Sequence, residues 1–434
     1  MKKSIITIGL IVTIGSIALL YNNKKEVLLN KEDITNNKSI AIYVKQEDGN
    51  YEKTNTIPES GYILNEEKSV CSNNSKPSWN FDTKSLKINN LNKNSTSCYL
   101  YFDSYCKPED TACQTILANK EVKVRDKITG PLTDNTTGKM YAAEDDDGMS
   151  YYFAGQVDNN FIKFAGYYWR IVRINGDGTI RIIYNGPTTS QTGETTQIGT
   201  SAFNDDGKDN AYVGYMYGTP GSSTYEETHA NINDSTIKKV IDNWYETNIA
   251  NNSNFVNKID VNAGFCNDRK VYEGENWTEF GTAGYNNNKT TYIFTSKILK
   301  WQNGDSIIKS IANVNLYCNN ENDLFTLNNA SKGNKALKYP IGLLTADEVF
   351  YLGNYIDSNV ETWLKTSLSY WTMTPFRKYD TADVFLVDYV NNVYGWGCND
   401  YLVGVRPVIN LKADTMFTSG DGTKDNPYIV EGAE

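Results

Sequence analysis

The chain has 434 residues, of which 39 % are hydrophobic and 22 % are charged, a balance typical of a folded protein that excludes wholesale disorder and a coiled-coil rod. Its 42 Lys and Arg residues against 52 Asp and Glu residues give a formal charge of −10, which disfavours nucleic acid as a partner because a phosphate backbone requires basic surfaces. At ordinary domain sizes the chain divides into two or three folded units.

The single histidine restricts the chemistry that the chain can perform. His229 cannot supply a two-histidine zinc site or a facial iron triad, and a Ser-His-Asp or Cys-His arrangement would depend on this one residue. It lies in a polar stretch between Glu226 and Asn231, so we expect an exposed side chain just before the start of a helix. The sequence indicates no metal and no other cofactor.

The first residues read as an export signal. Lys2 and Lys3 precede an uncharged apolar run from Ile5 to Tyr21. As a helix this run would cover about 25 Å, at the short end of what spans a hydrocarbon core of roughly 30 Å. We favour an uncleaved membrane anchor in residues 1–25, with the rest of the chain outside the cell, because the positive charges precede the run. With a cleaved signal the protein would instead be secreted.

Seven cysteines fit an exported chain. A disulfide between the first two, Cys71 and Cys98, would close a loop and stabilise a small domain by roughly 3 to 4 kcal/mol if the loop-entropy model holds. A zinc site is disfavoured because no C-x2-C motif is present. The predicted disulfides join Cys71 to Cys98, Cys106 to Cys113 and Cys266 to Cys318, which leaves Cys398 unpaired.

Residues 37–104 read as a small antiparallel β domain. Strand-like runs, the first at 40–44 and the last at 97–102, alternate with loops rich in Asn, Ser and Lys. A domain of this size buries little surface and would benefit from its predicted disulfide. Residues 105–125 follow as a linker with a helix from Thr111 to Val122.

Residues 126–434 are expected to form one larger unit, whose clearest feature is a hairpin. The runs 167–174 and 179–184 flank an Asn-Gly-Asp-Gly turn. Apolar Trp169, Ile171 and Ile174 suit a buried face of this hairpin. Arg170 and Arg173 are therefore expected to point outward.

The other elements of this unit alternate between helices and short strands. One helix is capped at Ser235 and runs to about residue 248, and a second begins at Thr345 and stops at Gly353. Strands are expected at 369–373, 383–388, 393–396 and 403–411. Two helices among many short strands predict an α+β fold class.

Two acidic loops, at 204–210 and 144–148, offer clustered oxygen atoms. Neither matches the EF-hand spacing, so we expect both to be solvated, the second as the turn of a hairpin. Paired carboxylates for glycoside hydrolysis stay an open alternative, because with 52 acidic residues any fold brings some pair close together.

The larger unit resembles uncharacterised surface modules of low-GC Gram-positive bacteria. The segments that carry the resemblance are YYWRIVRINGDGTIRIIYNG, GFCNDR, YPIGLLTADEV, YWTMTP and GVRPVINL, within residues 130–430. That group is similar to the C-type-lectin-like fold of formylglycine-generating enzymes and of the variable receptors of diversity-generating retroelements. The resemblance implies a C-type-lectin-like head behind a small all-β, disulfide-bonded N-terminal domain, and a place outside the cell. A fold does not supply the function.

The enzymatic branch of this group is disfavoured by its own motif. Formylglycine-generating enzymes hold copper with two thiolates close to a Gly-Phe-Arg-Cys strand. The matching stretch here, at 404–407, ends in Pro407, with Cys398 as the one thiol upstream. A single thiol cannot form a two-coordinate copper site.

The receptor branch implies a ligand face between Trp371 and Arg406. Aromatic side chains mixed with Asn and Asp provide flat apolar area and short hydrogen-bonding groups. Trp371 and Arg406 also suit purely structural roles, as cross-strand aromatic pairs do in many sheets. The candidate ligand-binding residues are Tyr370, Trp371, Arg377, Asp388, Tyr394, Trp396, Asn399, Tyr401 and Arg406.

Together these features predict a membrane-anchored extracellular binding or adhesion protein whose ligand is a protein or a glycan. One alternative is an extracellular enzyme, either like the formylglycine-generating enzymes or a carboxylate hydrolase. Another is a structural component of the envelope. A deep concavity near Trp396 with convergent acids would favour the enzyme.

Overall fold

The fold is mostly β. The computed structural model is 34 % strand and 15 % helix, so the predicted α+β class is wrong. The longest described helix has ten residues, and many strands have two or three, too few to show an alternating pattern in sequence. The described residues are 19–20, 26–28, 40–46, 50–57, 62–80, 85–89, 96–104, 106, 110–118, 120–222, 224–270, 292–293, 300–302, 306–308, 314–318, 320–355, 360–378 and 381–434.

The predicted transmembrane helix has no counterpart in this part of the chain. None of the described helices is long and apolar enough to cross a membrane. Residues 1–18 and 21–25, which make up most of the predicted anchor, lie outside the described residues. Within the apolar run, β1 (Leu19–Leu20) is a short strand that pairs with β2 (Glu26–Leu28).

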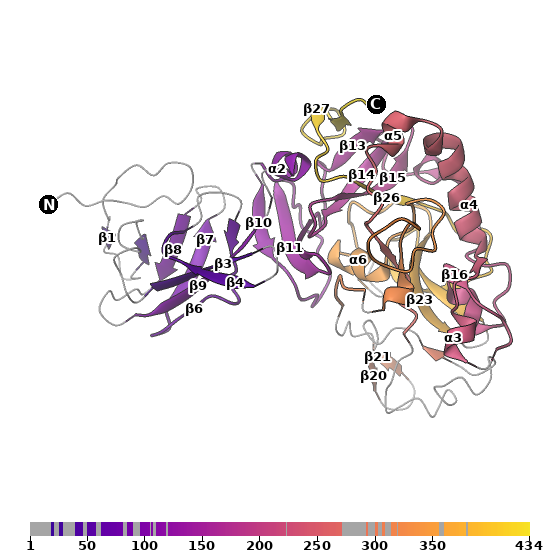
Figure 1. Ribbon diagram of the computed structural model, residues 1–434, viewed down its shortest axis with the longest axis horizontal. Coiled ribbons are helices and arrows are strands. Elements are labelled where there is room, and N and C mark those ends of the chain that lie inside the picture. The colour runs from indigo at the N-terminus through magenta and orange to yellow at the C-terminus, as the bar shows by residue number, and fades with distance from the viewer. Residues whose placement is uncertain are drawn as a thin grey trace.

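The N-terminal domain consists of two sheets around one small core (Figure 1). One sheet has the order β4-β3-β9-β5, with β6 also paired to β9, and the other has the order β1-β2-β8-β7. The domain is not purely antiparallel as predicted, because β3 and β9 run parallel, joined by a long crossover. The strands are β3 (Ile40–Lys45), β4 (Tyr51–Thr54), β5 (Tyr62–Leu64), β6 (Val70–Cys71), β7 (Lys76–Asn80), β8 (Ser85–Asn89) and β9 (Cys98–Ser104).

The predicted linker belongs largely to the larger unit, the head. Helix α2 (Thr111–Leu117) ends earlier than expected, and β10 (Glu121–Val124) is a strand that pairs in parallel with β11 (Lys139–Asp145). Cys113 and Ile116 of α2 are fully buried in the core of the head. The head therefore begins before residue 126.

All three predicted disulfides are present. They join Cys71 to Cys98, Cys106 to Cys113 and Cys266 to Cys318. Cys398 is free, as predicted, and its side chain is buried.

The head contains two larger sheets that share one core (Figure 1). One has the order β10-β11-β12-β14-β13-β28-β27, with β15 bridging β14 and β26; the other has the order β19-β23-β24-β25. The further strands of these sheets are β12 (Gly148–Tyr152), β13 (Phe161–Phe164), β14 (Tyr167–Ile174), β15 (Ile180–Gly186), β19 (Tyr292–Ile293), β23 (Tyr370–Lys378), β24 (Ala382–Val387), β25 (Val393–Gly397), β26 (Val408–Leu411), β27 (Phe417–Ser419) and β28 (Tyr428–Val430).

Short elements complete the head. The predicted caps are confirmed, since the side chains of Ser235 and Thr345 accept hydrogen bonds from the backbone at the starts of α4 and α6. The helices are α3 (Tyr225–Thr228), α4 (Thr236–Tyr245), a π-helical turn (Glu246–Ala250), α5 (Ser253–Val256) and α6 (Ala346–Tyr351); the paired short strands are β16 (Met216–Tyr217) with β17 (Asn233–Asp234), β18 (Phe265–Cys266) with β22 (Leu324–Phe325), and β20 (Lys300–Gln302) with β21 (Ser306–Ile308); 3₁₀ turns lie at Glu194–Thr196, Asn210–Val213 and Glu321–Asp323.

The predicted hairpin is confirmed, but the predicted orientation of its arginines is wrong. Strands β14 and β15 pair antiparallel around the Asn-Gly-Asp-Gly turn. Both faces of this hairpin are covered, so the residues between the apolar positions are buried as well. Arg170 is fully buried and donates to Asn160 Oδ1 at 2.5 Å and to the carbonyl oxygen of Val157 at 2.8 Å.

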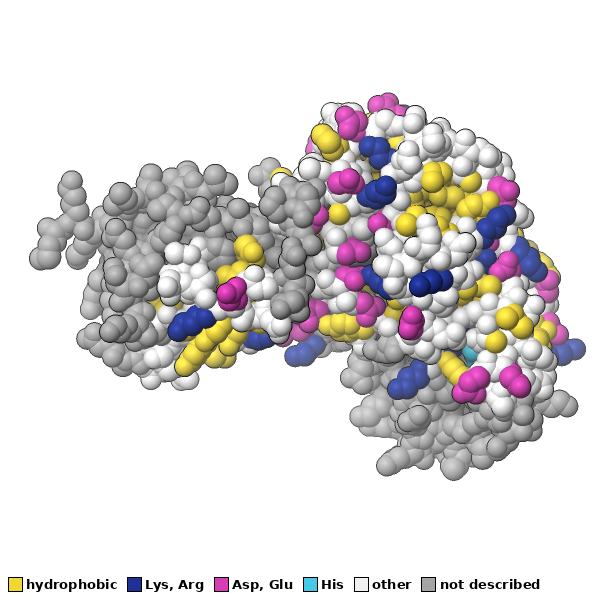
Figure 2. Space-filling view, viewed as in Figure 1, with side chains coloured by type: hydrophobic (Ala, Val, Ile, Leu, Met, Phe, Trp, Pro, Cys, Tyr) yellow, Lys and Arg dark blue, Asp and Glu magenta, His cyan; other side chains and the backbone are white. Residues whose placement is uncertain are grey.

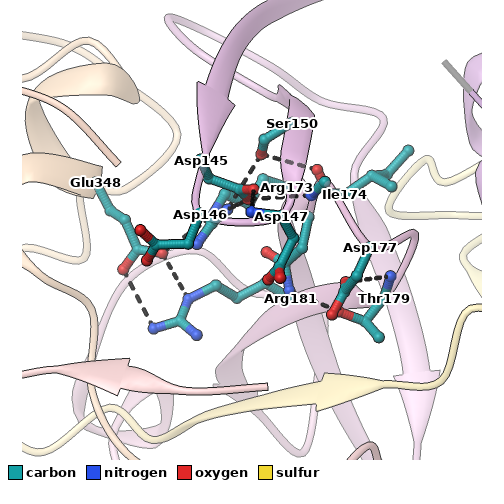
Figure 3. A network of polar contacts seen from close by, with 12 residues as sticks. Asp145, Asp146, Asp147, Ser150, Arg173, Ile174, Asp177, Thr179, Arg181 and Glu348 are labelled. Atoms are coloured by element: carbon teal, nitrogen blue, oxygen red, sulfur yellow. Dashed lines mark hydrogen bonds and ion pairs between the residues drawn. The ribbon is translucent and has the colours of Figure 1, made fainter. Parts of the chain in front are cut away.

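Arg173 lies at the centre of a buried network of charges (Figure 3). Its Nη1 lies 2.5 Å from Asp145 Oδ2, and its Nε lies 3.1 Å from Glu348 Oε1. Arg181 Nε approaches the same Glu348 oxygen to 2.6 Å. The other oxygen of Glu348 accepts the backbone N–H of Thr345 and so completes the capping box of α6. We call Asp145, Arg173, Arg181 and Glu348 the arginine–carboxylate network.

The network joins four elements of the head. Asp145 ends β11, the two arginines lie on β14 and β15, and Glu348 lies on α6. The acidic loop at 144–148 is the turn of a β11–β12 hairpin, as predicted, but Asp145 is buried and not solvated. Burial alone would raise the pKa of Glu348, but Arg181 and Arg173 outweigh it, so this pKa is lowered.

Replacing Glu348 with Gln should lower the free energy of unfolding by about 3 to 5 kcal/mol, because it leaves two buried guanidinium groups without their shared carboxylate. Chemical denaturation followed by tryptophan fluorescence measures this loss. The matched control is Glu361→Gln, which breaks an exposed ion pair with Lys365 and should cost less than about 1 kcal/mol. Equal effects of the two substitutions would contradict the role of the network.

The pH dependence of this loss follows from the lowered pKa of Glu348. A carboxyl group whose pKa is lowered in the folded protein contributes its full stabilisation only at pH values where the same group is ionised in the unfolded chain. For glutamate this means above its ordinary pKa of about 4.3. The stability difference between the wild type and Glu348→Gln should therefore be constant above about pH 6 and shrink as the pH falls through the folded-state pKa. Denaturation curves at several pH values test this, and a difference that grows in acid would contradict it.

Candidate ligand-binding site

Four of the nine predicted ligand-binding residues are buried, so they do not form a ligand face. Tyr370, Trp371 and Arg406 are each at most 2 % exposed, and Asp388 is 7 % exposed. Trp371 Nε1 donates to the carbonyl oxygen of Ser201 at 2.8 Å. This bond fixes β23 against the segment at Ser201, a structural role that the sequence pattern did not distinguish from ligand contact.

Arg406 and Asp388 have clear structural contacts. The guanidinium group of Arg406 donates to the carbonyl oxygens of Tyr184 and Leu364 and lies 4.9 Å from the ring centre of Tyr370. Asp388 Oδ1 accepts the backbone N–H groups of Val390 and Asn392 and so shapes the turn between β24 and β25. Both predictions of ligand contact are therefore corrected.

Arg377 and Tyr394 occupy intermediate positions. Arg377 Nε lies 2.8 Å from Asp383 Oδ2, so its charge is already neutralised within the sheet. Tyr394 is half-buried and packs edge-to-face against Trp396, with ring centres 5.9 Å apart. Tyr394 therefore supports the indole of Trp396 more than it offers a surface of its own.

The exposed candidates lie together on the end of β25 and the loop that follows. Trp396 and Tyr401 are 45 % and 55 % exposed, and Asn399 is exposed between them. Leu402, which the sequence reasoning missed, is 84 % exposed. We call Trp396, Tyr401 and Leu402, with the adjoining Asp205 and Asp400, the Trp396–Leu402 patch.

Hydrogen bonds fix the aromatic rings of this patch. Trp396 Nε1 donates to Asp400 Oδ2 at 2.7 Å, and Asp400 Oδ1 accepts the backbone N–H of Leu402 at 2.8 Å. Tyr401 Oη donates to Asp205 Oδ1 at 3.0 Å, and that oxygen also accepts the hydroxyl of Thr236 at 2.6 Å. The carboxylates thus hold both rings in place before any ligand arrives.

Cys398 joins the loop of the patch to the acidic loop at 204–210. Its backbone carbonyl oxygen accepts the N–H of Asn204 at 2.9 Å, and its Sγ donates to the carbonyl oxygen of Asp206 at 3.5 Å. Gly207 in turn accepts the N–H of Ala382 on β24. Burial raises the pKa of the Cys398 thiol, which disfavours the thiolate that a nucleophile or a copper ligand requires.

The acidic loop itself has mixed roles. Asp205 and Asp206 are exposed as expected, whereas Asp209 is buried and caps the turn at Asn210–Val213 through the N–H of Ala211. Across the described part of the chain, no group of three His, Cys, Asp or Glu residues could hold a metal ion. The sequence pointed to this loop as a group of oxygen atoms, but it gave no sign that Asp205 would meet Tyr401.

His229 is fully buried, so the prediction of an exposed residue before a helix is wrong. It follows α3 and stacks on Tyr225, with ring centres 4.4 Å apart and Nδ1 3.0 Å from the carbonyl oxygen of Tyr225. Burial, reinforced by Arg269, lowers its pKa well below the ordinary value. His229 is therefore a neutral packing residue.

A small cavity of about 50 Å³ lies beside the arginine–carboxylate network and not beside the patch. Its lining includes Asp146, Asp347, Glu348 and Tyr317, and Trp396 is not among the lining residues. The volume is enough for a few water molecules but is far below that of an ordinary ligand pocket. The enzyme alternative expects a deep pocket with acidic residues near Trp396. This cavity has acidic residues in its lining, but it is small and does not lie near Trp396.

No family model, no curated protein and no solved structure matches the chain. The resemblance to bacterial surface modules therefore stays a prediction.

The burial of Cys398 makes a direct prediction about its reactivity. A thiol reagent should not modify Cys398 in the native protein on the time scale of minutes, but should modify it fully in denaturant. The matched control is Asn399→Cys, whose new thiol occupies the adjacent exposed position and should react promptly in the native state. Intact-mass spectrometry counts the labels. Prompt native labelling of the wild type would contradict the described packing of the two loops.

Proposed function

We propose that the protein is an extracellular binding or adhesion protein that contacts its ligand through the Trp396–Leu402 patch. The observation that carries the proposal is the concentration of three exposed large apolar side chains in residues 396–402. Exposed apolar residues scattered singly need no explanation, whereas a cluster with a polar rim is typical of an interaction surface.

The fixed rings of the patch support this proposal. Tyrosine and tryptophan offer large contact areas on side chains with few rotatable bonds, so they lose little conformational entropy on binding. Hydrogen bonds to Asp400 and Asp205 remove part of the remaining freedom in advance. Preorganised aromatic groups of this kind suit a binding surface.

The three disulfides support a location outside the cell. Disulfides persist in oxidising compartments, and reducing conditions would open them. They occur in both the N-terminal domain and the head, so the whole described chain suits the same compartment. The proposal requires export but does not depend on how the chain is retained afterwards.

Replacing Trp396 and Tyr401 together with Ala should abolish binding to the ligand while leaving the melting temperature within a few degrees of the wild type, because exposed side chains contribute little to folding. The test screens the full chain against arrays of glycans and of purified surface proteins. The matched control is Tyr389→Ala, which removes an exposed tyrosine outside the patch. An array without ligands, or a ligand bound equally by all three proteins, would contradict the proposal.

A further inference from the structure

We infer that the ligand of the Trp396–Leu402 patch is a basic protein segment, recognised through Arg or Lys side chains. This inference rests on the proposed function and adds the chemical class of the ligand. It follows from the charge of the patch and from the way its hydrogen-bonding groups are used.

The two loops that form the patch are strongly acidic. Residues 204–210 and 396–402 contain four aspartates and one lysine, Lys208. Asp209 is buried, so the other three aspartates and Lys208 give these two loops a formal surface charge of −2. Figure 2 shows acidic and basic side chains interspersed over the face of the head in view. A locally negative surface attracts a cationic partner and repels an anionic one.

The carboxylates lie directly beside the exposed rings. Asp400 contacts the indole N–H of Trp396, and Asp205 contacts the hydroxyl of Tyr401. A guanidinium or ammonium group that lies on either ring face therefore has a carboxylate within reach. Such a position combines a cation–π contact with a charge-assisted hydrogen bond. Leu402, next to Tyr401 in the chain, is 84 % exposed and adds apolar surface for methylene stems.

The hydrogen-bonding groups of the rings also distinguish a cationic ligand from a neutral glycan. The Trp396 N–H and the Tyr401 O–H already donate to Asp400 and Asp205. What these four side chains still present is acceptor capacity on the carboxylate oxygens. A neutral sugar would use both donors and acceptors, whereas Arg and Lys bring donors alone. The remaining capacity of the patch fits the cation.

The experiment compares short fluorescent peptides of alternating Ser and Arg, Ser and Lys, and Ser and Glu by anisotropy with the full chain. The Arg and Lys peptides should bind, with affinity that falls as salt is raised, and the Glu peptide should not bind. Asp205→Asn with Asp400→Asn keeps the size of the side chains and one acceptor oxygen on each but removes two charges, and should weaken binding of the Arg peptide about tenfold.

The matched control is Asp414→Asn with Asp425→Asn, which makes the same change in net charge at exposed positions outside the patch and should leave binding unchanged. Equal binding by the two double variants, or no preference for Arg over Glu, would overturn the inference. A neutral glycan that binds the wild type but not the Trp396→Ala, Tyr401→Ala variant would overturn it as well, while leaving the proposed function standing.

Discussion

The head depends on the arginine–carboxylate network, in which four buried charged side chains form ion pairs with one another. Glu348 accepts contacts from Arg173 and Arg181 through the same oxygen, and Arg173 also contacts Asp145. Removing these groups from water costs several kcal/mol each, and only good mutual geometry recovers that cost. The network therefore requires that β11, the β14–β15 hairpin and α6 assemble in one arrangement, since any other would leave a buried charge without a partner.

The same network positions the candidate ligand-binding surface. Glu348 fixes the start of α6, where the backbone N–H of Ala346 donates to Thr374 on β23 at 2.8 Å. Strand β23 pairs with β24, and β24 pairs with β25, which carries Trp396. The patch thus lies at the β25 edge of a sheet whose strand β23 contacts the start of α6. Rigid support of this kind suits a surface that binds without rearranging.

Local patterns predicted local features well. The Cys106–Cys113 disulfide, the caps at Ser235 and Thr345, and the β14–β15 hairpin all follow from spacing and composition within short stretches. The burial of Arg173 could not be predicted in this way, because its partners come from residues 145 and 348. The fold class failed for a related reason: strands of two or three residues form only where another segment pairs with them.

The candidate site was predicted in part. Trp396 and Tyr401 are exposed as a ligand face requires, while Trp371 is buried because a strand covered on both sides uses large side chains for packing. Arg406 is buried in the segment before β26. A strand that is buried on one face and a strand that is buried on both carry similar aromatic patterns, and the sequence does not tell them apart. Asp205 joins the patch only through the fold.

Native-state hydrogen exchange tests most directly whether the arginine–carboxylate network makes the head one cooperative unit. Two backbone N–H groups report on it: that of Leu352 donates to the carbonyl oxygen of Glu348 at the end of α6, and that of Phe153 donates to the carbonyl oxygen of Val172. Both should exchange with the same free energy, equal to that of global unfolding. A much lower value for Leu352 than for Phe153 would show that α6 opens by itself, and would contradict the account.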